Sequence, residues 1–351
     1  MARSGCIYSP TGGRKTSQVK DFAHYIAWKT GKATLLLSTD GGGWDPCIPE
    51  VAAGMIRPYR CEVANLPLSL LRKISQGYWP EDPEQTDPAS INLIPMPFDE
   101  VGGIAVEGWS SVSQVVMRFL PDQGISVGGE DRKKVGANMA FSASVKVMGQ
   151  WQEQSFGSNT RGDYGFVQNF LYGLVMNFNS LPVEYVLYTA LESKTEDDDR
   201  STTFGPAIAG KKGTRDCGAW VGDLIHGQDY PIARKEQVPD PSDATKQIEQ
   251  EVIDLTVRFH FKKHLDPATG IPFPAKARVT PEQIGPLLKR FPGGYFEPTI
   301  VNGNVRDGFG EYLRVVDSLG VAQADALKGW RERADQRLGR TAAEGSKQGI
   351  Q

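Results

Sequence analysis

A short glycine-containing segment near the start of the sequence has the residue types of a phosphate-binding loop. The general pattern is glycine, four residues, glycine, lysine, and then serine or threonine. Residues 9–16 read Ser-Pro-Thr-Gly-Gly-Arg-Lys-Thr, so Lys15 and Thr16 stand where the pattern requires them. The Lys15 ammonium group would reach the β- and γ-phosphates of a nucleotide, and the Thr16 hydroxyl would bind Mg²⁺. Backbone N–H groups of residues 12–16, at a helix N-terminus, would surround the phosphates.

Two positions of this segment depart from the general pattern. Ser9 stands where the first glycine is expected, and Arg14 stands where the last one is expected. Gly12 and Gly13 could supply the backbone freedom that such a loop needs. An ordinary glycine turn before a helix is the structural alternative. The residues that we expect to contact the nucleotide are Ser9, Thr11, Gly12, Gly13, Arg14, Lys15 and Thr16.

Acidic residues follow two of the apolar runs that we expect to be strands. Asp40 comes after ATLLLST, and Glu107 closes IAVE. The carboxyl ends of parallel strands line the ligand crevice of an α/β sheet. Asp40 is therefore a candidate to polarise the water that attacks a γ-phosphate, and Glu107 is a candidate Mg²⁺ ligand, directly or through water. Each could instead be a plain surface acid at the end of a strand.

Three further polar residues are candidates for contacts with the γ-phosphate. Thr189 ends the run EYVLYT and could act as a sensor, although a satisfied hydroxyl at a strand end is an equal alternative. Lys211 and Lys212 follow Gly-Pro and Gly in GPAIAGKK, which predicts an exposed loop. Such lysines could stabilise transition-state charge, also on a neighbouring subunit, as arginine fingers do. The alternative is a solvated basic loop.

Two other groups of residues have a weaker chemical pattern. His260 and His264 lie four apart, but no acid stands between them as in the zinc-protease signature, and we interpret them as ordinary histidines. Residues 132–134 are basic and, with Trp151 and Arg161, mix cations with aromatic rings. That mixture suits single-stranded nucleic acid, although its density is low and favours a solvated loop.

Alternating strands and helices must hold these residues in place. Residues 33–39 are a continuous apolar run, which is typical of a strand buried on both faces. Residues 16–28 repeat apolar side chains at intervals of three and four, which predicts a helix ending at Gly31. The expected strands are 4–8, 33–39, 102–107 and 183–190, and the expected helices are 16–28, 109–120 and 163–180. This alternation predicts an α/β fold with a mainly parallel central sheet.

The rest of the chain divides by composition. We expect a nucleotide-binding core over residues 1–235, with a loop insertion at about 122–160, and a small C-terminal extension over 236–320. An amphipathic helix and a disordered tail would follow over 321–351. The predicted detail is a surface loop at 77–100, a linker at 236–245, a strand or helix at 251–261, and turns with short strands at 264–280.

Composition excludes several classes of protein. The 351 residues are 39% hydrophobic and 23% charged, which is enough for a sizeable core, and the net charge of −3 gives no global attraction to nucleic acid. The four cysteines form no Cys-x-x-Cys pair, which argues against zinc and suits a reducing cytoplasm. We expect no signal peptide, and no apolar run approaches the roughly 18 residues of a membrane span.

The order of these motifs resembles a known family. Over residues 3–280 the chain carries SPTGGRKT, TGKATLLLSTD, IAVEGWSSV, VEYVLYTA and PAIAGKK, and then HLDPATGIPFPAKAR. This order is similar to a RecA-like P-loop NTPase core. More narrowly, it resembles the phage-encoded nucleotide-binding proteins of the Sak type, which keep that core without its flanking domains.

The resemblance implies a set of expectations. Asp40 occupies the place of the family's catalytic glutamate, with ATP and Mg²⁺ as cofactors. The family handles and anneals single-stranded DNA in recombination, beside a single-strand-binding protein. Its sites form between subunits, so we expect a homo-oligomer in which Lys211 and Lys212 reach a neighbour's γ-phosphate. A phage protein of this kind would act in the cytoplasm of the host cell.

Two functional hypotheses follow. In the first, the chain is an oligomeric ATPase that acts on single-stranded DNA, as the retained Lys15, Thr16, Asp40 and Glu107 favour. In the second, it is a degenerate P-loop domain that serves as a structural or interaction component of a phage assembly, without turnover. The altered loop favours the second hypothesis.

Overall fold

The computed structural model describes most of the chain. Some predicted positions lie outside the described residues, namely Asp40, the basic residues 132–134 and the C-terminal segment 321–351. The predictions made for them therefore stay open. The described residues are 2–39, 45–61, 68–83, 85, 90–122, 141–147, 150–156, 161–196, 202–209, 211–240, 243–267, 269–301 and 304–319.

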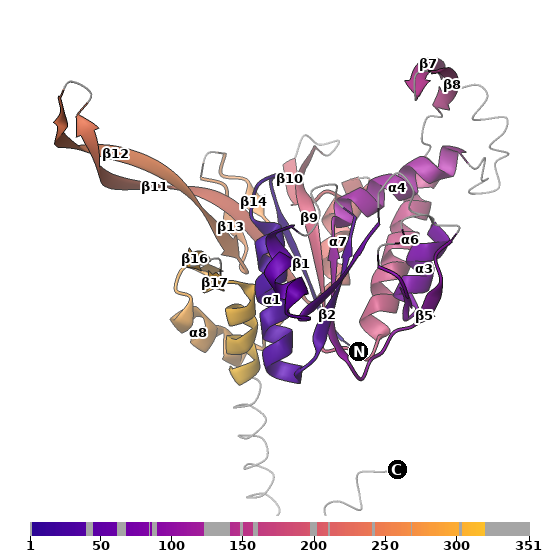
Figure 1. Cartoon of the computed structure of the whole chain (residues 1–351), viewed down its shortest axis with the longest axis horizontal. Coiled ribbons are helices and arrows are strands. Elements are labelled where there is room, and N and C mark those ends of the chain that lie inside the picture. Colours follow the sequence, from indigo (N-terminus) through magenta and orange to yellow (C-terminus); the bar gives the residue numbers. More distant parts are fainter. Residues whose placement is uncertain are drawn as a thin grey trace, which may run out of the picture.

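A central mixed sheet organises the fold (Figure 1). Its strands lie in the order β15-β12-β11-β1-β9-β6-β2-β3, and β10 pairs with β9 off this path. All pairs from β11 through β1 to β3 are parallel, whereas the pairs made by β12, β15 and β10 are antiparallel. The prediction of an α/β fold with a mainly parallel sheet is confirmed. The strand bounds are β1 Arg3–Ser9, β2 Ala33–Ser38, β3 Ile56–Arg60, β6 Val101–Glu107, β9 Tyr185–Glu196, β10 Thr202–Pro206, β11 Asp223–Asp240, β12 Asp243–His260 and β15 Tyr295–Phe296.

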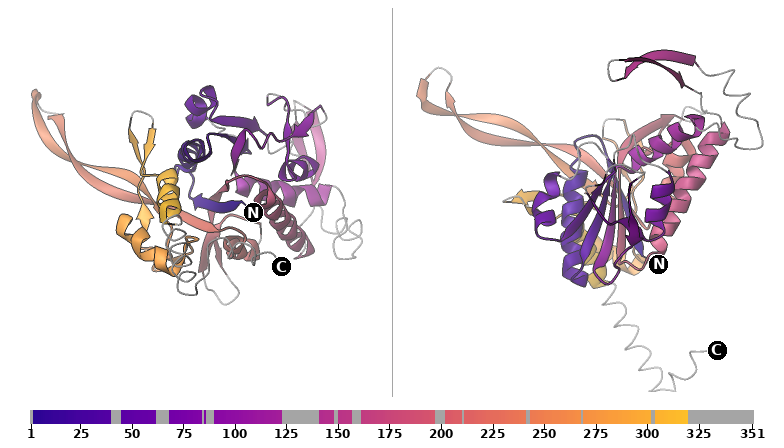
Figure 2. Two further views of the ribbon diagram at one scale, coloured as in Figure 1. Left: turned by 90° about the horizontal axis from the view of Figure 1, so that it is seen from below. Right: turned by 45° about the vertical axis from the view of Figure 1, so that its right-hand side comes forward.

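Helices cover both faces of the sheet, as the two views of Figure 2 show. One face packs against α1 (Lys15–Thr30), α8 (Pro281–Arg290) and helical residues 309–319. The other face packs against α3 (Leu68–Ser75), α4 (Trp109–Asp122), α6 (Arg161–Ser180) and α7 (Lys211–Trp220). Two hydrophobic clusters result, one on each face, and the inner strands lie between them.

Burial on both faces explains the continuous apolar runs. Every residue of β2 is buried, and so is every residue of β6. Such strands cannot alternate apolar with polar residues, because neither face meets water. On α1, Val19, Phe22 and Ile26 are fully buried at the helical spacing. Gly31 ends that helix with φ 68°, a left-handed conformation that favours glycine.

A long two-stranded ribbon replaces the predicted linker. Strands β11 and β12 pair antiparallel from His226↔His260 out to Val238↔Ile248 and extend away from the body of the molecule (Figure 1). The interpretation of 236–245 as a linker was therefore wrong, and residues 251–261 are resolved as strand through His260. The segment is polar and contains proline, but the backbone pairing of two strands does not depend on a continuous apolar face. β11 also runs through the expected boundary between 235 and 236 without a break.

Smaller elements complete the described structure. Residues 77–100, predicted to be a surface loop, contain β4 (Tyr78–Pro80) and β5 (Leu93–Pro95), and Trp79 is buried in the core. The insertion at 122–160 contains a hairpin of β7 (Phe141–Val147) and β8 (Gln150–Phe156). The remaining bounds are η1 Asp45–Cys47, α2 Ile48–Ala52, β13 His264–Leu265, β14 Pro272–Phe273, β16 Thr299–Val301 and β17 Asn304–Arg306. None of the helices in the described ranges has the length and apolarity to cross a bilayer.

Candidate functional site

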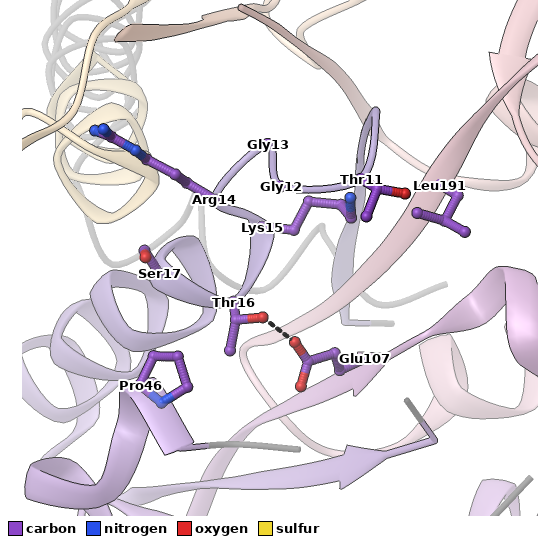
Figure 3. A pocket seen from close by; sticks show the side chains of 10 residues that line it. All are labelled: Thr11, Gly12, Gly13, Arg14, Lys15, Thr16, Ser17, Pro46, Glu107 and Leu191. Carbon is purple, nitrogen blue, oxygen red and sulfur yellow. Dashed lines mark hydrogen bonds between the residues drawn. The ribbon is translucent and has the colours of Figure 1, made fainter. Parts of the chain in front are cut away.

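A cleft of about 400 Å³ opens at the carboxyl ends of β1 and β6, beside Leu191 of β9 (Figure 3). It contains six of the seven loop residues that we expect to contact the nucleotide, together with the acid that ends β6. The seventh, Ser9, is fully buried behind the loop. The lining residues are Thr11, Gly12, Gly13, Arg14, Lys15, Thr16, Ser17, Pro46, Glu107 and Leu191.

Backbone geometry shows why the loop needs small residues at two positions. Gly12 has φ 84°, where a side chain would be strained. A Cβ atom on Gly13 would lie 2.2 Å from Ser9 Oγ and 2.7 Å from Ser9 Cβ, so that position has no room for a side chain. Arg14 takes φ 54° and ψ 29°, the left-handed conformation that glycine supplies in the general pattern. Arg14 therefore has a backbone conformation that glycine adopts more readily.

The Lys15 ammonium group lies against the start of the loop. Its Nζ atom donates hydrogen bonds to the Ser9 carbonyl at 3.1 Å, Ser9 Oγ at 3.1 Å and the Pro10 carbonyl at 2.9 Å. Lys15 is the first residue of α1, and the side chain of the N-cap residue Arg14 makes no capping hydrogen bond. The positive end of the helix and the lysine charge thus meet in one cleft, which favours an anionic ligand.

Thr16 and Glu107 meet at the floor of the cleft. The Thr16 hydroxyl donates a hydrogen bond to Glu107 Oε1, and Ser38 Oγ lies 3.4 Å from the other carboxylate oxygen. Ser38 ends β2 and pairs in register with Glu107, which ends β6. Glu107 is only 3% exposed, so its carboxylate is held by these hydroxyls in a position that side-chain rotation does not easily change.

These oxygen atoms fit the requirements of Mg²⁺. That ion prefers hard oxygen ligands and is often held by one or two protein groups, with water and phosphate completing the shell. A threonine hydroxyl and a carboxylate supply two such oxygens. Groups of three or more histidine, cysteine or acidic side chains able to hold a metal are absent from the described residues, so a resident all-protein metal cage is not found there.

Thr189 lies behind the cleft rather than in it. Its hydroxyl accepts a hydrogen bond from the Gly108 N–H at 3.2 Å, and the side chain is buried. Two residues further along β9, Leu191 lines the cleft, and its N–H donates to Ser110 Oγ at 2.8 Å. Both bonds fasten the middle of β9 to the residues that follow β6. The hydroxyl is thus satisfied, as the alternative had it, but the prediction that Thr189 ends its strand was wrong, because β9 continues to Glu196.

The two lysines predicted to lie on a loop are the first residues of α7. The loop prediction was therefore wrong, because the glycines and proline of GPAIAGKK precede a helix instead of surrounding a turn. Upstream of the helix, the Ala209 N–H donates to Ser113 Oγ at 2.6 Å. The Thr214 hydroxyl in turn donates to the Ile208 carbonyl at 3.2 Å.

A cysteine beside the cleft is chemically inert. Cys47 is fully buried, and its Sγ lies 3.9 Å from the Thr16 carbonyl. Burial, and secondarily the charges of Glu107 and Glu50, raise the pKa of the Cys47 thiol to about 12. The thiol is neutral at physiological pH and is therefore not a nucleophile for this site.

Sequence reasoning missed a histidine cluster at the base of the ribbon. His226 Nε2 lies 2.6 Å from Glu192 Oε2, and His226 Nδ1 lies 3.1 Å from His264 Nε2. The His260 ring stacks on His264 with centroids 3.6 Å apart. Burial lowers the pKa of His260 to about 3 and that of His264 to about 4, so both are neutral at pH 7. Only the fold brings His226 and Glu192 to His260 and His264, so no local sequence signal identifies the whole cluster.

Comparison with known proteins identifies no relative. No family model matches the chain, and no curated protein sequence is significantly similar to it.

Proposed function

We propose that the cleft binds ATP with Mg²⁺ and that the chain is an ATPase with a RecA-like core. The observation that carries this proposal is the contact between Thr16 and Glu107, which lie 91 residues apart in sequence. A hydroxyl at the start of the loop helix and a carboxylate at the end of a neighbouring strand are the two protein groups that hold Mg²⁺ in a phosphate-loop site. An ordinary glycine turn would not require this pairing.

The surrounding residues support the same interpretation. Lys15 would exchange its contacts with the Ser9 and Pro10 carbonyls for phosphate oxygens, which are stronger acceptors for a cation. Bound Mg²⁺ would neutralise phosphate charge and orient the β- and γ-phosphates. Glu107 and Thr16 would hold it from the protein side. Asp40 follows β2, which lies beside β6, and we retain it as the candidate that orients the attacking water.

The biological setting remains a proposal based on resemblance alone. We propose that the protein acts on single-stranded DNA in phage recombination or replication, beside a single-strand-binding protein, as Sak-type proteins do.

Calorimetry with ATP and Mg²⁺ tests the binding site. We expect Lys15→Ala to lower ATP affinity at least tenfold, because a charge-assisted hydrogen bond is worth about 1.5–3 kcal/mol. Lys194→Ala is the matched control, since this exposed lysine lies on β9 outside the cleft and is expected to bind ATP like the wild type. Equal ATP affinity in the wild type and Lys15→Ala would overturn the assignment of the loop.

A second candidate function is nucleotide binding without turnover inside a phage assembly. The specific observation that favours it is Arg14, which replaces the last glycine of the general pattern and holds a left-handed conformation among the residues that line the cleft. Steady-state ATP hydrolysis, with and without single-stranded DNA, separates the two candidates. Turnover that Asp40→Asn abolishes while ATP binding persists supports the ATPase, and absence of wild-type turnover under both conditions supports the binding domain.

A further inference from the structure

The phosphate loop begins at the end of β1, which lies between β9 and β11. A side-chain hydrogen bond joins these two neighbouring strands across β1. β1 pairs with β9 on one side and with β11 on the other. Ser9 is opposite Leu191 of β9, and Tyr8 is opposite His226 of β11. Glu192 follows Leu191, and its hydrogen bond to His226 at 2.6 Å therefore spans β1 from one neighbour to the other.

This hydrogen bond is built into a buried environment. His226 is only 1% exposed, and Glu192 is 18% exposed. A carboxylate can only accept, so His226 Nε2 carries the hydrogen and donates it. The His226 ring lies between aromatic partners, with centroids 4.8 Å from Tyr8 and 4.0 Å from Phe273, which fix its orientation. A short hydrogen bond from a fixed ring to a carboxylate is among the stronger contacts of its kind.

The spanned residues connect directly to the phosphate loop. The charge of Glu192 contributes to the raised pKa of Tyr8, after the larger effect of burial. One residue further, Ser9 supplies the carbonyl and hydroxyl that hold Lys15. A Cβ added to Gly227, the residue after His226, would lie 2.9 Å from Ser9 Cβ, so β11 packs tightly against the start of the loop.

Glu192 also connects to the opposite wall of the cleft. The preceding residue, Leu191, lines the cleft and is fastened to Ser110 beyond β6. On the other side of β1, His226 continues to His264 at 3.1 Å, at the base of the ribbon. The carboxylate is thus the link between the cleft wall and the strand that carries the ribbon.

We propose that Glu192 and His226 are positioning residues for nucleotide binding. Their hydrogen bond across β1, which we call the clasp, holds the first residues of the phosphate loop in the conformation that binds phosphate. This role rests on the proposed function of the cleft. In this role, neither Glu192 nor His226 contacts the nucleotide. They act through Tyr8, Ser9 and Leu191, and their loss lets the loop sample conformations that do not bind phosphate, which weakens binding without removing any phosphate ligand.

Hydrogen exchange in the nucleotide-free protein tests the clasp without relying on ATP. In Glu192→Ala and in His226→Phe, which keeps an aromatic ring against Phe273, we expect the amides of Ser9 and residues 11–17 to exchange about tenfold faster, the factor for a lost hydrogen bond of about 1.4 kcal/mol. Glu192→Gln keeps an acceptor and is expected to stay near the wild type. Glu196→Ala is the matched control, because this acid of β9 is exposed and far from His226 in the sheet register.

ATP affinity, measured on the same variants, tests the positioning role. We expect Glu192→Ala and His226→Phe to weaken ATP binding five- to twentyfold, with Glu192→Gln and Glu196→Ala within about twofold of the wild type. Unchanged exchange and unchanged affinity in Glu192→Ala would overturn the proposal. Faster exchange in a protein whose wild type binds no ATP would establish the clasp as purely structural and reject its role for nucleotide, together with the proposed function. ATP binding by the wild type with an unaffected Glu192→Ala variant rejects the clasp alone.

Discussion

The hydroxyl of Thr16 donates a hydrogen bond to the carboxylate of Glu107, although one residue begins a helix near the N-terminus and the other ends a strand beyond residue 100. The contact joins a loop helix to the acid of a parallel strand at the edge where such sheets bind ligands. It defines the floor of the cleft and gives the first prediction.

Glu107→Gln should remove the effect of Mg²⁺ on ATP binding. An amide oxygen is a weaker ligand for Mg²⁺ than a carboxylate, whereas Lys15 and the loop N–H groups are unchanged. We expect the wild type to bind ATP about tenfold more tightly with Mg²⁺ than with a chelator, and the variant to bind equally in both conditions. Calorimetry with and without a chelator measures this. Glu196→Gln, on the exposed part of β9, is the control, and a variant with the full Mg²⁺ effect would contradict the role of Glu107.

The stability of Arg14 variants should depend on how readily the new residue adopts the left-handed backbone conformation of this position. A left-handed residue other than glycine costs roughly 1–2 kcal/mol, and a β-branched side chain makes the conformation less accessible still. We expect Arg14→Gly to be at least as stable as the wild type, while Arg14→Val loses about 1 kcal/mol of unfolding free energy. Urea denaturation of the three proteins decides this. Equal stability of the valine and glycine variants would show that residue 14 does not hold φ 54° in solution.

Acidification should destabilise the fold through the histidine cluster. The pKa of His260 is lowered to about 3 and that of His264 to about 4, from an ordinary value of 6.5, so below pH 6.5 the unfolded chain binds protons that the folded chain does not. Stability from these groups is therefore complete above pH 6.5 and falls as the pH drops towards 4. Allowing for solvent screening, we expect a loss of about 1 kcal/mol per histidine between pH 7 and pH 5.

A double His260→Phe, His264→Phe variant provides the comparison for that prediction. Urea denaturation at pH 7, 6 and 5 should show a shallower fall in the variant than in the wild type. Asp21, whose pKa burial raises to about 6, contributes in the opposite direction but is present in both proteins and cancels. Parallel pH profiles would contradict the assignment of the effect to the cluster.

Assembly should depend on nucleotide if the site is shared between subunits. We expect a homo-oligomer that becomes more stable with a non-hydrolysable ATP analogue. The reason is that charge pairs between the lysines of one subunit and the nucleotide of its neighbour can form only in the assembled state. A Lys211→Ala, Lys212→Ala variant should still bind ATP and lose this response. Analytical ultracentrifugation at micromolar protein measures it. A monomer with and without analogue and DNA would reject the shared site and weaken the RecA-like mechanism.

The sequence alone determined the elements that form the centre of this protein. The apolar run at 33–39 and the helical spacing at 16–28 predicted β2 and α1 within two residues at each end, because burial on both faces and a helix stripe leave local patterns. The types and spacing of Lys15 and Thr16 likewise marked the loop before any fold was known.

The tertiary structure decided everything that depends on which strands are neighbours. β1 lies between β11 and β9, and this order lets Glu192 reach His226 across β1. β6 lies on the other side of β9, and its last residue, Glu107, contacts Thr16 at the start of α1. No local pattern encodes this order of strands. The ribbon was misread as a linker for a related reason. Backbone hydrogen bonds to a partner strand hold it, and Tyr230, Ile232 and Leu255 are exposed although they are apolar, so side-chain polarity gave no periodic signal for the pairing.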